Sequence, residues 1–203
     1  MRIVVATGNA GKFAEIREIL ANLDVTLVAQ RELGVSAPEE TAATFVENAL
    51  IKARHAAAET GLPAIADDSG LVVAALDGRP GVHSARYAGP EARDRDNVEK
   101  LLGELDGVEP ARRGAHFHCV AVFLRGPSDP APLLAEGRWE GRITAAPRGE
   151  AGFGYDPVFL DPVRGLTAAE MSAADKNAAS HRGQAFRSLA ARLLAHGVLR
   201  AGP

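Results

Sequence analysis

The first residues that could do chemistry lie near the start of the chain, where an apolar run meets glycines and a lysine. The run at residues 3–6 is followed by Thr7, Gly8, Asn9, Ala10, Gly11 and Lys12. Residues 13–20 carry apolar side chains at helical spacing, so this segment joins a strand to a helix. Backbone N–H groups at a helix N-terminus attract anions, and a lysine adds positive charge. The segment is a candidate phosphate-binding loop, and an ordinary loop with a surface lysine stays open as the alternative.

Two pairs of adjacent acidic residues form the second feature. Asp67 and Asp68 follow an apolar run that predicts a buried strand. Ligands of α/β sheets commonly bind where strands end, and neighbouring carboxylates repel unless a cation relieves them. We therefore expect a divalent metal here, held by one of the two acids because side chains alternate along a strand. Glu39 and Glu40 form another pair, which taken alone is more simply interpreted as complementing a helix dipole.

A helix predicted over residues 45–60 carries a further candidate. Thr44 and Glu47 form a capping box at its start, and Gly61 ends it. Lys52 faces the same way as Asn48, four residues earlier. A lysine on a helix is usually solvated, so Lys52 gains interest only if this helix borders the phosphate loop.

An aromatic loop near the end of the chain forms the third cluster, and it consists of Gly152, Phe153, Gly154, Tyr155, Asp156 and Pro157. Glycines around two aromatic residues and an acid suit a loop that holds a flat ring, because an aromatic face stacks on any nucleobase. Lys176, His181 and Arg182 follow, and an arginine can donate to a purine carbonyl oxygen. Taken singly, the two aromatic residues are also explained as hydrophobic core. The three later residues are also explained as solvated side chains at the start of a helix.

Other histidine and cysteine residues carry weaker signals. His116 and His118 share one face of a predicted strand, but no third ligand is near, so a packed or edge strand face is the simpler interpretation. Cys119 is expected in the core. A single cysteine cannot form an internal disulfide, which fits a reducing cytoplasm.

The elements that must position these residues alternate between strands and helices, which predicts an α/β fold. The expected strands are residues 3–6, 25–29, 64–66, 115–124, 133–143 and 158–160. A separate short apolar run occupies residues 71–73. The expected helices are residues 13–20, 45–60, 94–105 and 181–196. We therefore expect a mixed sheet with flanking helices, and a single domain over residues 1–203.

The composition excludes several classes of protein. Of 203 residues, 46% are hydrophobic and 24% charged, which is ordinary for a globular protein and unlike a disordered tail. Lys and Arg number 23 against 26 Asp and Glu, a net charge of −3, so no broad basic field invites nucleic acid or anionic lipid. No apolar run approaches the ~18 residues of a membrane span, and the N-terminus lacks a secretory pattern. We expect a soluble cytoplasmic protein.

The order of these segments resembles the non-canonical purine nucleoside triphosphate pyrophosphatases, also called inosine triphosphatases or XTP/dITP diphosphatases. The segments that carry the resemblance are residues 7–12, 40–41, 45–49, 52–53, 66–71, 80–87, 152–157 and 180–183. The resemblance implies hydrolysis of ITP, dITP and XTP to the monophosphate and pyrophosphate. It also implies an elongated two-lobed mixed sheet with flanking helices, an active-site cleft between the lobes, and a homodimer.

The resemblance further implies a role for each candidate residue. The phosphate loop and Lys52 would bind the triphosphate, Ser69 would touch the substrate, and Glu40 and Asp68 would hold Mg²⁺. Asp68 would also be the catalytic proton acceptor for water. The base would be cradled by Phe153, Gly154, Tyr155 and Asp156. Its polar edge would be contacted by Lys176, His181 and Arg182.

Two other functions stay open on the sequence. A septum-inhibitor-type pyrophosphatase acting on dTTP or UTP should lack the aromatic loop and the pair His181 and Arg182. A sensor that binds nucleotide without hydrolysis has no need of Glu40, Asp68 and Lys12 together, because a pure binder requires no activated water.

Overall fold

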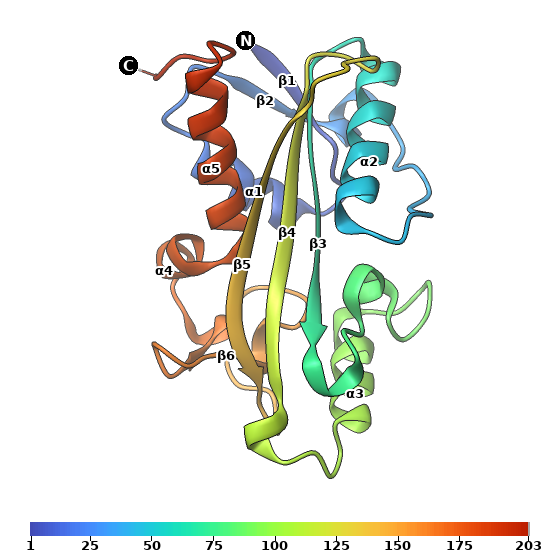
Figure 1. The fold of residues 1–203 in the computed structure, drawn as a ribbon, viewed down its shortest axis with the longest axis vertical. Coiled ribbons are helices and arrows are strands. Elements are labelled where there is room, and N and C mark those ends of the chain that lie inside the picture. The colour runs from blue at the N-terminus through green and yellow to red at the C-terminus, as the bar shows by residue number, and fades with distance from the viewer. Residues whose placement is uncertain (203) are drawn as a thin grey trace. The chain divides into compact units, whose positions relative to one another are not determined.

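The computed structural model describes residues 1–202, which divide into two compact units. Unit 1 contains Met1–Asp68, Cys119–Gly137 and residues 181–202, and unit 2 contains Ser69–His118 and Arg138–Ser180. A seven-stranded sheet has the order β2-β1-β3-β4-β5-β6-β7. Both units receive residues from β3 (Ala64–Val73), β4 (Gly114–Leu124) and β5 (Leu133–Ile143). Figure 1 shows these three long strands side by side. The predicted mixed α/β sheet is confirmed.

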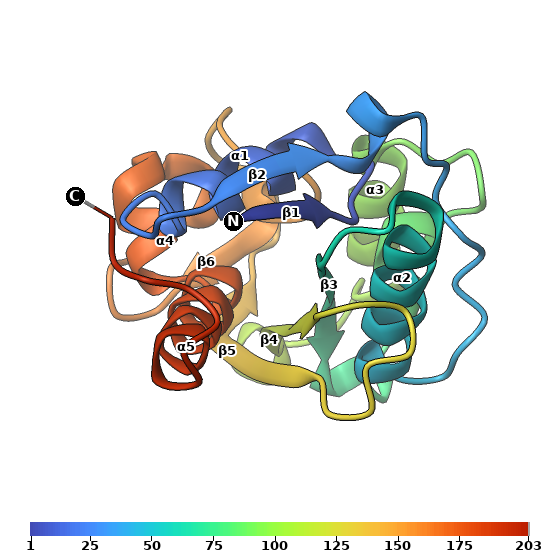
Figure 2. The ribbon, with the colours of Figure 1, turned by 90° about the horizontal axis from the view of Figure 1, so that it is seen from above.

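Unit 1 is built around parallel strands with helices on both faces. The strand β1 (Arg2–Val5) pairs in parallel with β2 (Thr26–Ala29) and with the start of β3. Because side chains alternate along β1, Ile3 and Val5 pack with α1 (Ala10–Ile19) and α5 (His181–Ala195) on one face. Val4 faces the other way, toward α2 (Phe45–Thr60) (Figure 2). The candidate phosphate loop therefore follows a strand in which Ile3, Val4 and Val5 are all buried.

The helix α2 begins and ends where its sequence predicts. Thr44 Oγ1 accepts the N–H of Glu47 and donates to its carboxylate at 2.6 Å, which forms half of a capping box. Gly61 ends the helix in the left-handed region, with φ of 66°. Four fully buried alanines let α2 lie close to the sheet, and they are Ala49, Ala53, Ala56 and Ala57. This close approach brings Lys52 to the strand that carries the acidic pair.

Unit 2 combines the remaining parts of the long strands with short elements. Its elements are α3 (Asp94–Glu104), β6 (Phe159–Asp161), β7 (Leu166–Thr167) and α4 (Ala173–Ala179). The strands β5, β6 and β7 are antiparallel neighbours. The aromatic core contains Phe117, Trp139 and Phe159, with ring centroids 4.5–6.4 Å apart. Leu101 of α3 and its C-cap residue Leu105 pack into the same core.

Short 3₁₀ helices connect many of these elements. They are η1 (Gln30–Leu33), η2 (Ala74–Leu76), η3 (Gly81–Arg86), η4 (Pro110–Arg112), η5 (Asp156–Val158) and η6 (Ala168–Glu170). The short helix α4 had no counterpart in the expectation. Its seven residues are too few to display a clear apolar period, and its Ser172 cap is the one local signal.

The strand that carries the acidic pair is longer than expected. A strand ending before Asp67, with a separate run at residues 71–73, was the prediction, and it is wrong because β3 is continuous from Ala64 to Val73. Asp67 and Asp68 are 2% and 4% exposed. Their charges are compensated by lysine and arginine side chains, so two carboxylates can lie within a buried strand rather than end it.

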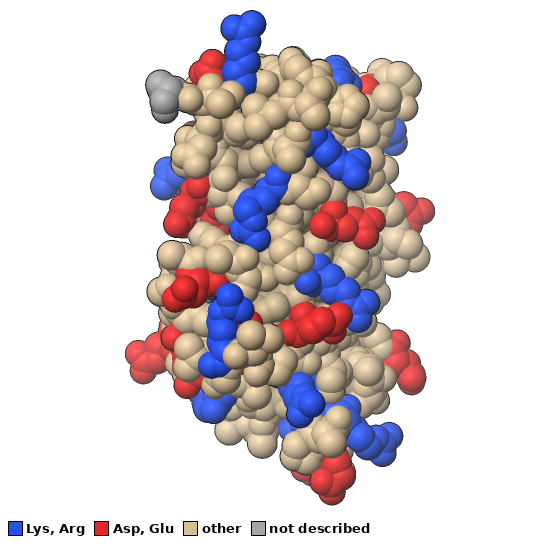
Figure 3. Space-filling view, turned by 60° about the vertical axis from the view of Figure 1, so that its left-hand side comes forward, with Lys and Arg blue, Asp and Glu red and all other residues tan. Residues whose placement is uncertain are grey.

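The surface carries mixed charge on the face that Figure 3 shows, where Lys and Arg lie between Asp and Glu. This matches the small net charge of −3. Within residues 1–202, no helix combines the length and hydrophobicity that a bilayer crossing requires.

Candidate active site

The candidate phosphate loop lies between β1 and α1 in unit 1. Asn9 caps α1, because its Oδ1 accepts the backbone N–H of Lys12 at 3.0 Å, while Thr7 Oγ1 accepts the N–H of Asn9 at 3.2 Å. These bonds shape the turn and leave the first-turn N–H groups of Ala10 and Gly11 without an intrahelical acceptor. The loop thus has the local structure that an anion site at a helix N-terminus requires.

Asp67 joins this loop to the C-terminal helix. Its Oδ2 lies 3.3 Å from Lys12 Nζ and 3.4 Å from Arg182 Nε. A second ion pair joins Arg182 Nη1 to Glu15 Oε2 at 2.5 Å. Burial alone would raise the pKa of Asp67, but the charges of Lys12 and Arg182 outweigh it and hold that pKa well below its usual range. Asp67 therefore stays ionised and orients two cations.

Lys52 brings the two predicted metal ligands together. Its Nζ lies 2.7 Å from Asp68 Oδ1 and 2.9 Å from Glu40 Oε1. Burial favours the neutral lysine, but the neighbouring carboxylates, led by Asp68, outweigh this and hold the pKa of Lys52 above its ordinary value. Burial raises the pKa of Asp68 above its usual range, and Lys52 offsets only part of that effect. The two acids converge on one cation.

The alternation predicted for the acidic pair is confirmed by these contacts. Asp67 reaches α1 and α5 through Lys12 and Arg182, whereas Asp68 reaches α2 through Lys52. The two carboxylates therefore lie on opposite faces of β3 and cannot share one role.

Asn48 is a residue that the sequence analysis noted only as a neighbour of Lys52. It is fully buried, its Oδ1 accepts the N–H of Ala42 at 3.1 Å, and its Nδ2 donates to the Ala42 carbonyl at 3.3 Å. The same Nδ2 lies 3.5 Å from Asp68 Oδ2. Asn48 thus anchors the segment that bears Glu40 beside Asp68. Its position one turn before Lys52 was the available signal.

The donor set of Glu40 and Asp68 fits a hard divalent cation. Mg²⁺ prefers oxygen ligands and is commonly held by one or two carboxylates together with substrate phosphates and water. Two carboxylate oxygens already flank a single positive charge here, the Lys52 ammonium. The residues present therefore match such an ion.

The aromatic loop lies in unit 2 and is held by its own acid. Asp156 Oδ2 accepts the N–H of Phe153 at 2.9 Å and pairs with Lys176 Nζ at 2.6 Å. Lys176 Nζ also lies 4.7 Å from the centroid of the Phe153 ring. Gly152 has φ of 80°, and a Cβ there would come within 2.1 Å of Asp156 Oδ2. The loop conformation therefore requires glycine at residue 152.

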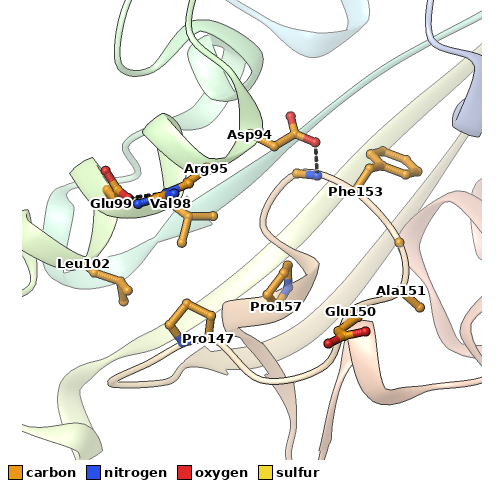
Figure 4. A pocket seen from close by; sticks show the side chains of 12 residues that line it. Asp94, Arg95, Val98, Glu99, Leu102, Pro147, Glu150, Ala151, Phe153 and Pro157 are labelled. Carbon is orange, nitrogen blue, oxygen red and sulfur yellow. Dashed lines mark hydrogen bonds and ion pairs between the residues drawn. The ribbon is translucent and has the colours of Figure 1, made fainter.

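Tyr155 and Phe153 have different surroundings. Tyr155 is 4% exposed within the core of unit 2, and its hydroxyl donates to the Ser84 carbonyl at 2.8 Å. Burial raises the pKa of Tyr155, so this donor stays protonated. Phe153 is half-buried and lines a cavity of about 640 Å³ between α3 and residues 147–157 (Figure 4). Tyr155 therefore anchors the loop, and Phe153 is the residue available to a ligand.

The remaining candidates divide between the units. Ser69 and Lys176 belong to unit 2, whereas His181 and Arg182 open α5 in unit 1. Their joint contact with a base, and the cleft in which it would occur, stay predictions. Cys119 is buried, as expected. The described chain, residues 1–202, has no group of three or more His, Cys, Asp or Glu side chains placed to hold a metal, so His116 and His118 belong to none.

Unit 1 thus combines a loop at a helix N-terminus, two lysines and two carboxylates that converge on one of them, on an α/β fold. This is a chemistry suited to anionic ligands and hard cations. The chain belongs to the Ham1 family, whose model matches residues 3–192. The family resemblance of the sequence is thereby confirmed.

Individual relatives cover most of the chain. The "dITP/XTP pyrophosphatase" of Xanthomonas oryzae pv. oryzae is 63% identical over 169 residues, which are 83% of this chain and 85% of that protein. The protein of the same name from Yersinia pseudotuberculosis is 57% identical, over 84% of this chain and 87% of its own. A solved HAM1 protein from Coxiella burnetii has a TM-score of 0.89 and 50% identity, covering 96% of this chain and 99% of its own.

Proposed function

We propose that this chain is a metal-dependent pyrophosphohydrolase of non-standard purine nucleotides, which converts dITP, ITP and XTP to the monophosphate and pyrophosphate. The relatives' name, dITP/XTP pyrophosphatase, supports the substrate class. The observation that carries the chemistry is that Glu40 and Asp68 converge on Lys52. Asp68 lies on β3, which pairs with β1, the strand that precedes the phosphate loop.

Phosphoryl transfer depends on positioning and charge neutralisation more than on covalent catalysis. The N–H groups of the loop at residues 7–12 bind phosphate oxygens. Lys12 adds a positive charge, and its side chain is oriented by the ion pair with Asp67. Lys52 supplies a second cation from α2. These groups hold the triphosphate in line with the attacking water.

Asp68 has the properties of the group that accepts a proton from that water. When bound by Glu40 and Asp68, a Mg²⁺ ion neutralises phosphate charge and acidifies water. Burial raises the pKa of Asp68, and the ion pair with Lys52 offsets part of that effect. Its position beside Glu40, at the proposed metal site, is what suits Asp68 to take the proton. Asp67 does not fit this role, because it contacts Lys12 and Arg182 on the opposite face of β3.

The base is bound by the aromatic loop. Phe153 stacks on the purine, and Lys176 and Asp156 keep the ring in place. As the resemblance implies, Lys176, His181 and Arg182 contact the polar edge of the base, and a donor such as Arg182 pairs with the 6-keto oxygen of hypoxanthine or xanthine. Adenine carries an amino group there, and a donor left without its acceptor can cost about 10⁴-fold in kcat/KM.

A nucleotide panel tests this proposal. We expect Mg²⁺-dependent release of pyrophosphate from dITP, ITP and XTP, with ATP and dTTP nearly inert. Pyrophosphate and orthophosphate are assayed separately, and GTP is included to measure how guanine is treated. Turnover mainly of dTTP would contradict the purine site, and orthophosphate release would contradict the reaction.

We also propose a homodimer of single-domain chains acting in the cytoplasm, as the family resemblance implies. Light scattering coupled to gel filtration measures the mass directly. A species of about 42 kDa is expected, twice the 21.2 kDa of the chain, and a monomer at all concentrations would contradict the dimer.

A further inference from the structure

An aspartate outside every segment that carried the family resemblance contacts the aromatic loop. Asp94 is the first residue of α3, and its Oδ2 accepts the backbone N–H of Gly154 at 2.7 Å (Figure 4). Gly154 directly follows Phe153, so this bond holds the peptide group that joins the two residues. Asp94 is itself exposed, and both residues lie in unit 2.

The helix that carries Asp94 is firmly placed relative to the loop. Asn97, one turn further along α3, accepts the N–H of Ala88 at 2.8 Å and donates to the Ala85 carbonyl at 3.1 Å. The neighbouring Ser84 carbonyl accepts the Tyr155 hydroxyl. Two consecutive loop residues are therefore tied to α3 and to η3, and Asn97 ties those two elements to each other.

A cavity lies beside the hydrogen bond between Gly154 and Asp94, and both residues line it. The cavity has a volume of about 640 Å³ and lies between α3 and the loop (Figure 4). Val98 and Leu102 line it from the helix, and Pro147 and Pro157 line it from the loop. Apolar side chains do not fill the space between the two walls, so packing gives the loop little support on this side. The bond from Gly154 to Asp94 joins the walls at the edge of the cavity.

We propose that Asp94 is a positioning residue for nucleobase binding. Gly154 has φ of 61° and, as a glycine, can adopt many conformations, so its peptide rotates readily unless it is held. Asp94 fixes that peptide and thereby the direction in which the Phe153 ring faces the base. The inference rests on the proposed function, in which Phe153 stacks on the purine.

Kinetics of three variants test the proposal with dITP as substrate. Asp94→Ala removes the acceptor, and we expect KM to rise about fivefold with kcat within twofold. Asp94→Asn keeps an acceptor oxygen without the charge and should restore a KM near wild type. Glu99→Gln is the matched control, because it removes a charge from the same helix and the same cavity wall but only an exposed pair with Arg95.

Inhibition by the two products separates positioning from general damage. Asp94→Ala should weaken inhibition by dIMP by the same factor as it raises KM, and it should leave inhibition by pyrophosphate unchanged, because pyrophosphate has no base. If Asp94 had a purely structural role, Asp94→Ala would weaken inhibition by both products or by neither. An equal rise of KM in Asp94→Asn and Asp94→Ala would show that helix-dipole charge acts instead, and would overturn the proposal.

A double-mutant cycle with Phe153→Ala distinguishes failure of this inference from failure of the proposed function. If Asp94 acts through the Phe153 ring, Asp94→Ala should add no further rise of KM in the Phe153→Ala background. Additive effects, or no effect of Asp94→Ala where Phe153→Ala raises KM, would overturn the role of Asp94. An unchanged KM in Phe153→Ala would overturn the proposed base site itself.

Discussion

At the residue scale, adjacent aspartates on β3 have separate tasks. Asp68 shares Lys52 with Glu40 on the α2 face, while Asp67 pairs with Lys12 and Arg182 on the opposite face. The environment of each carboxylate separates their pKa values, because burial raises that of Asp68 and cations hold that of Asp67 down. We propose that Asp68 accepts a proton, whereas Asp67 keeps two cations in place.

The variant Asp67→Asn tests the second task. It removes the buried carboxylate that lies between Lys12 and Arg182, although Arg182 keeps its pair with Glu15, so we expect the free energy of unfolding at pH 7 to fall by about 3 kcal/mol. Because the folded-state pKa of Asp67 is depressed, its contribution is present above the unfolded pKa of about 3.9 and disappears as pH falls through the folded value. Urea unfolding between pH 7 and pH 2 measures both effects.

A matched control uses the exposed Asp106. Asp106→Asn makes the same chemical change at the surface, and its free energy of unfolding should stay within about 0.5 kcal/mol of wild type. Below about pH 4, Asp67→Asn should lose less stability than wild type. If the free energy of unfolding fell equally with pH in Asp67→Asn and in wild type below about pH 4, the ion pairs assigned to Asp67 would be contradicted.

At the element scale, the aromatic loop depends on backbone conformation as much as on its side chains. Gly152 has a positive φ and lies against the carboxylate of Asp156, which in turn holds Phe153 and Lys176. Any side chain at residue 152 pushes Asp156 away from both partners. The loop, and with it the direction of the Phe153 ring, then relaxes.

The pair Gly152→Ala and Gly165→Ala tests this dependence. Both glycines have positive φ, but a Cβ at residue 165 meets nothing within 4 Å. Gly165→Ala should therefore cost about 1 kcal/mol of stability and leave kcat/KM for dITP unchanged. Gly152→Ala should lower kcat/KM at least tenfold, and equal kinetics of the two variants would refute the requirement for glycine at residue 152.

Local patterns in the sequence predict many of these elements. The capping box at Thr44 gives the start of α2, and alternation along β3 correctly separates Asp67 from Asp68. The same sequence misplaces the end of that strand, because charged residues look like a loop when their partners are unknown. Arg182 is 167 residues from Glu15 and 115 from Asp67, and no local pattern reports pairings of that range.

At the scale of the whole molecule, each unit holds one half of the expected chemistry. Unit 1 contains the candidate phosphate loop, which ends at Lys12, and Lys52 with the carboxylates of Glu40 and Asp68. Unit 2 contains the aromatic loop with Lys176. The segments expected to bind the triphosphate and the segments expected to bind the base thus belong to different units. Each unit has its own buried hydrophobic residues.

The central claim is that Asp68 supports pyrophosphate release from a 6-keto purine nucleotide, and turnover of dITP by Asp68→Asn tests it most directly. Wild type should release one pyrophosphate for each dIMP in the presence of Mg²⁺. The variant should bind dITP with a Kd close to that of wild type and lose kcat by about 10²-fold to 10⁴-fold, the usual contribution of a positioned base. A kcat near wild type would contradict the role of Asp68, and orthophosphate as the product would contradict the reaction.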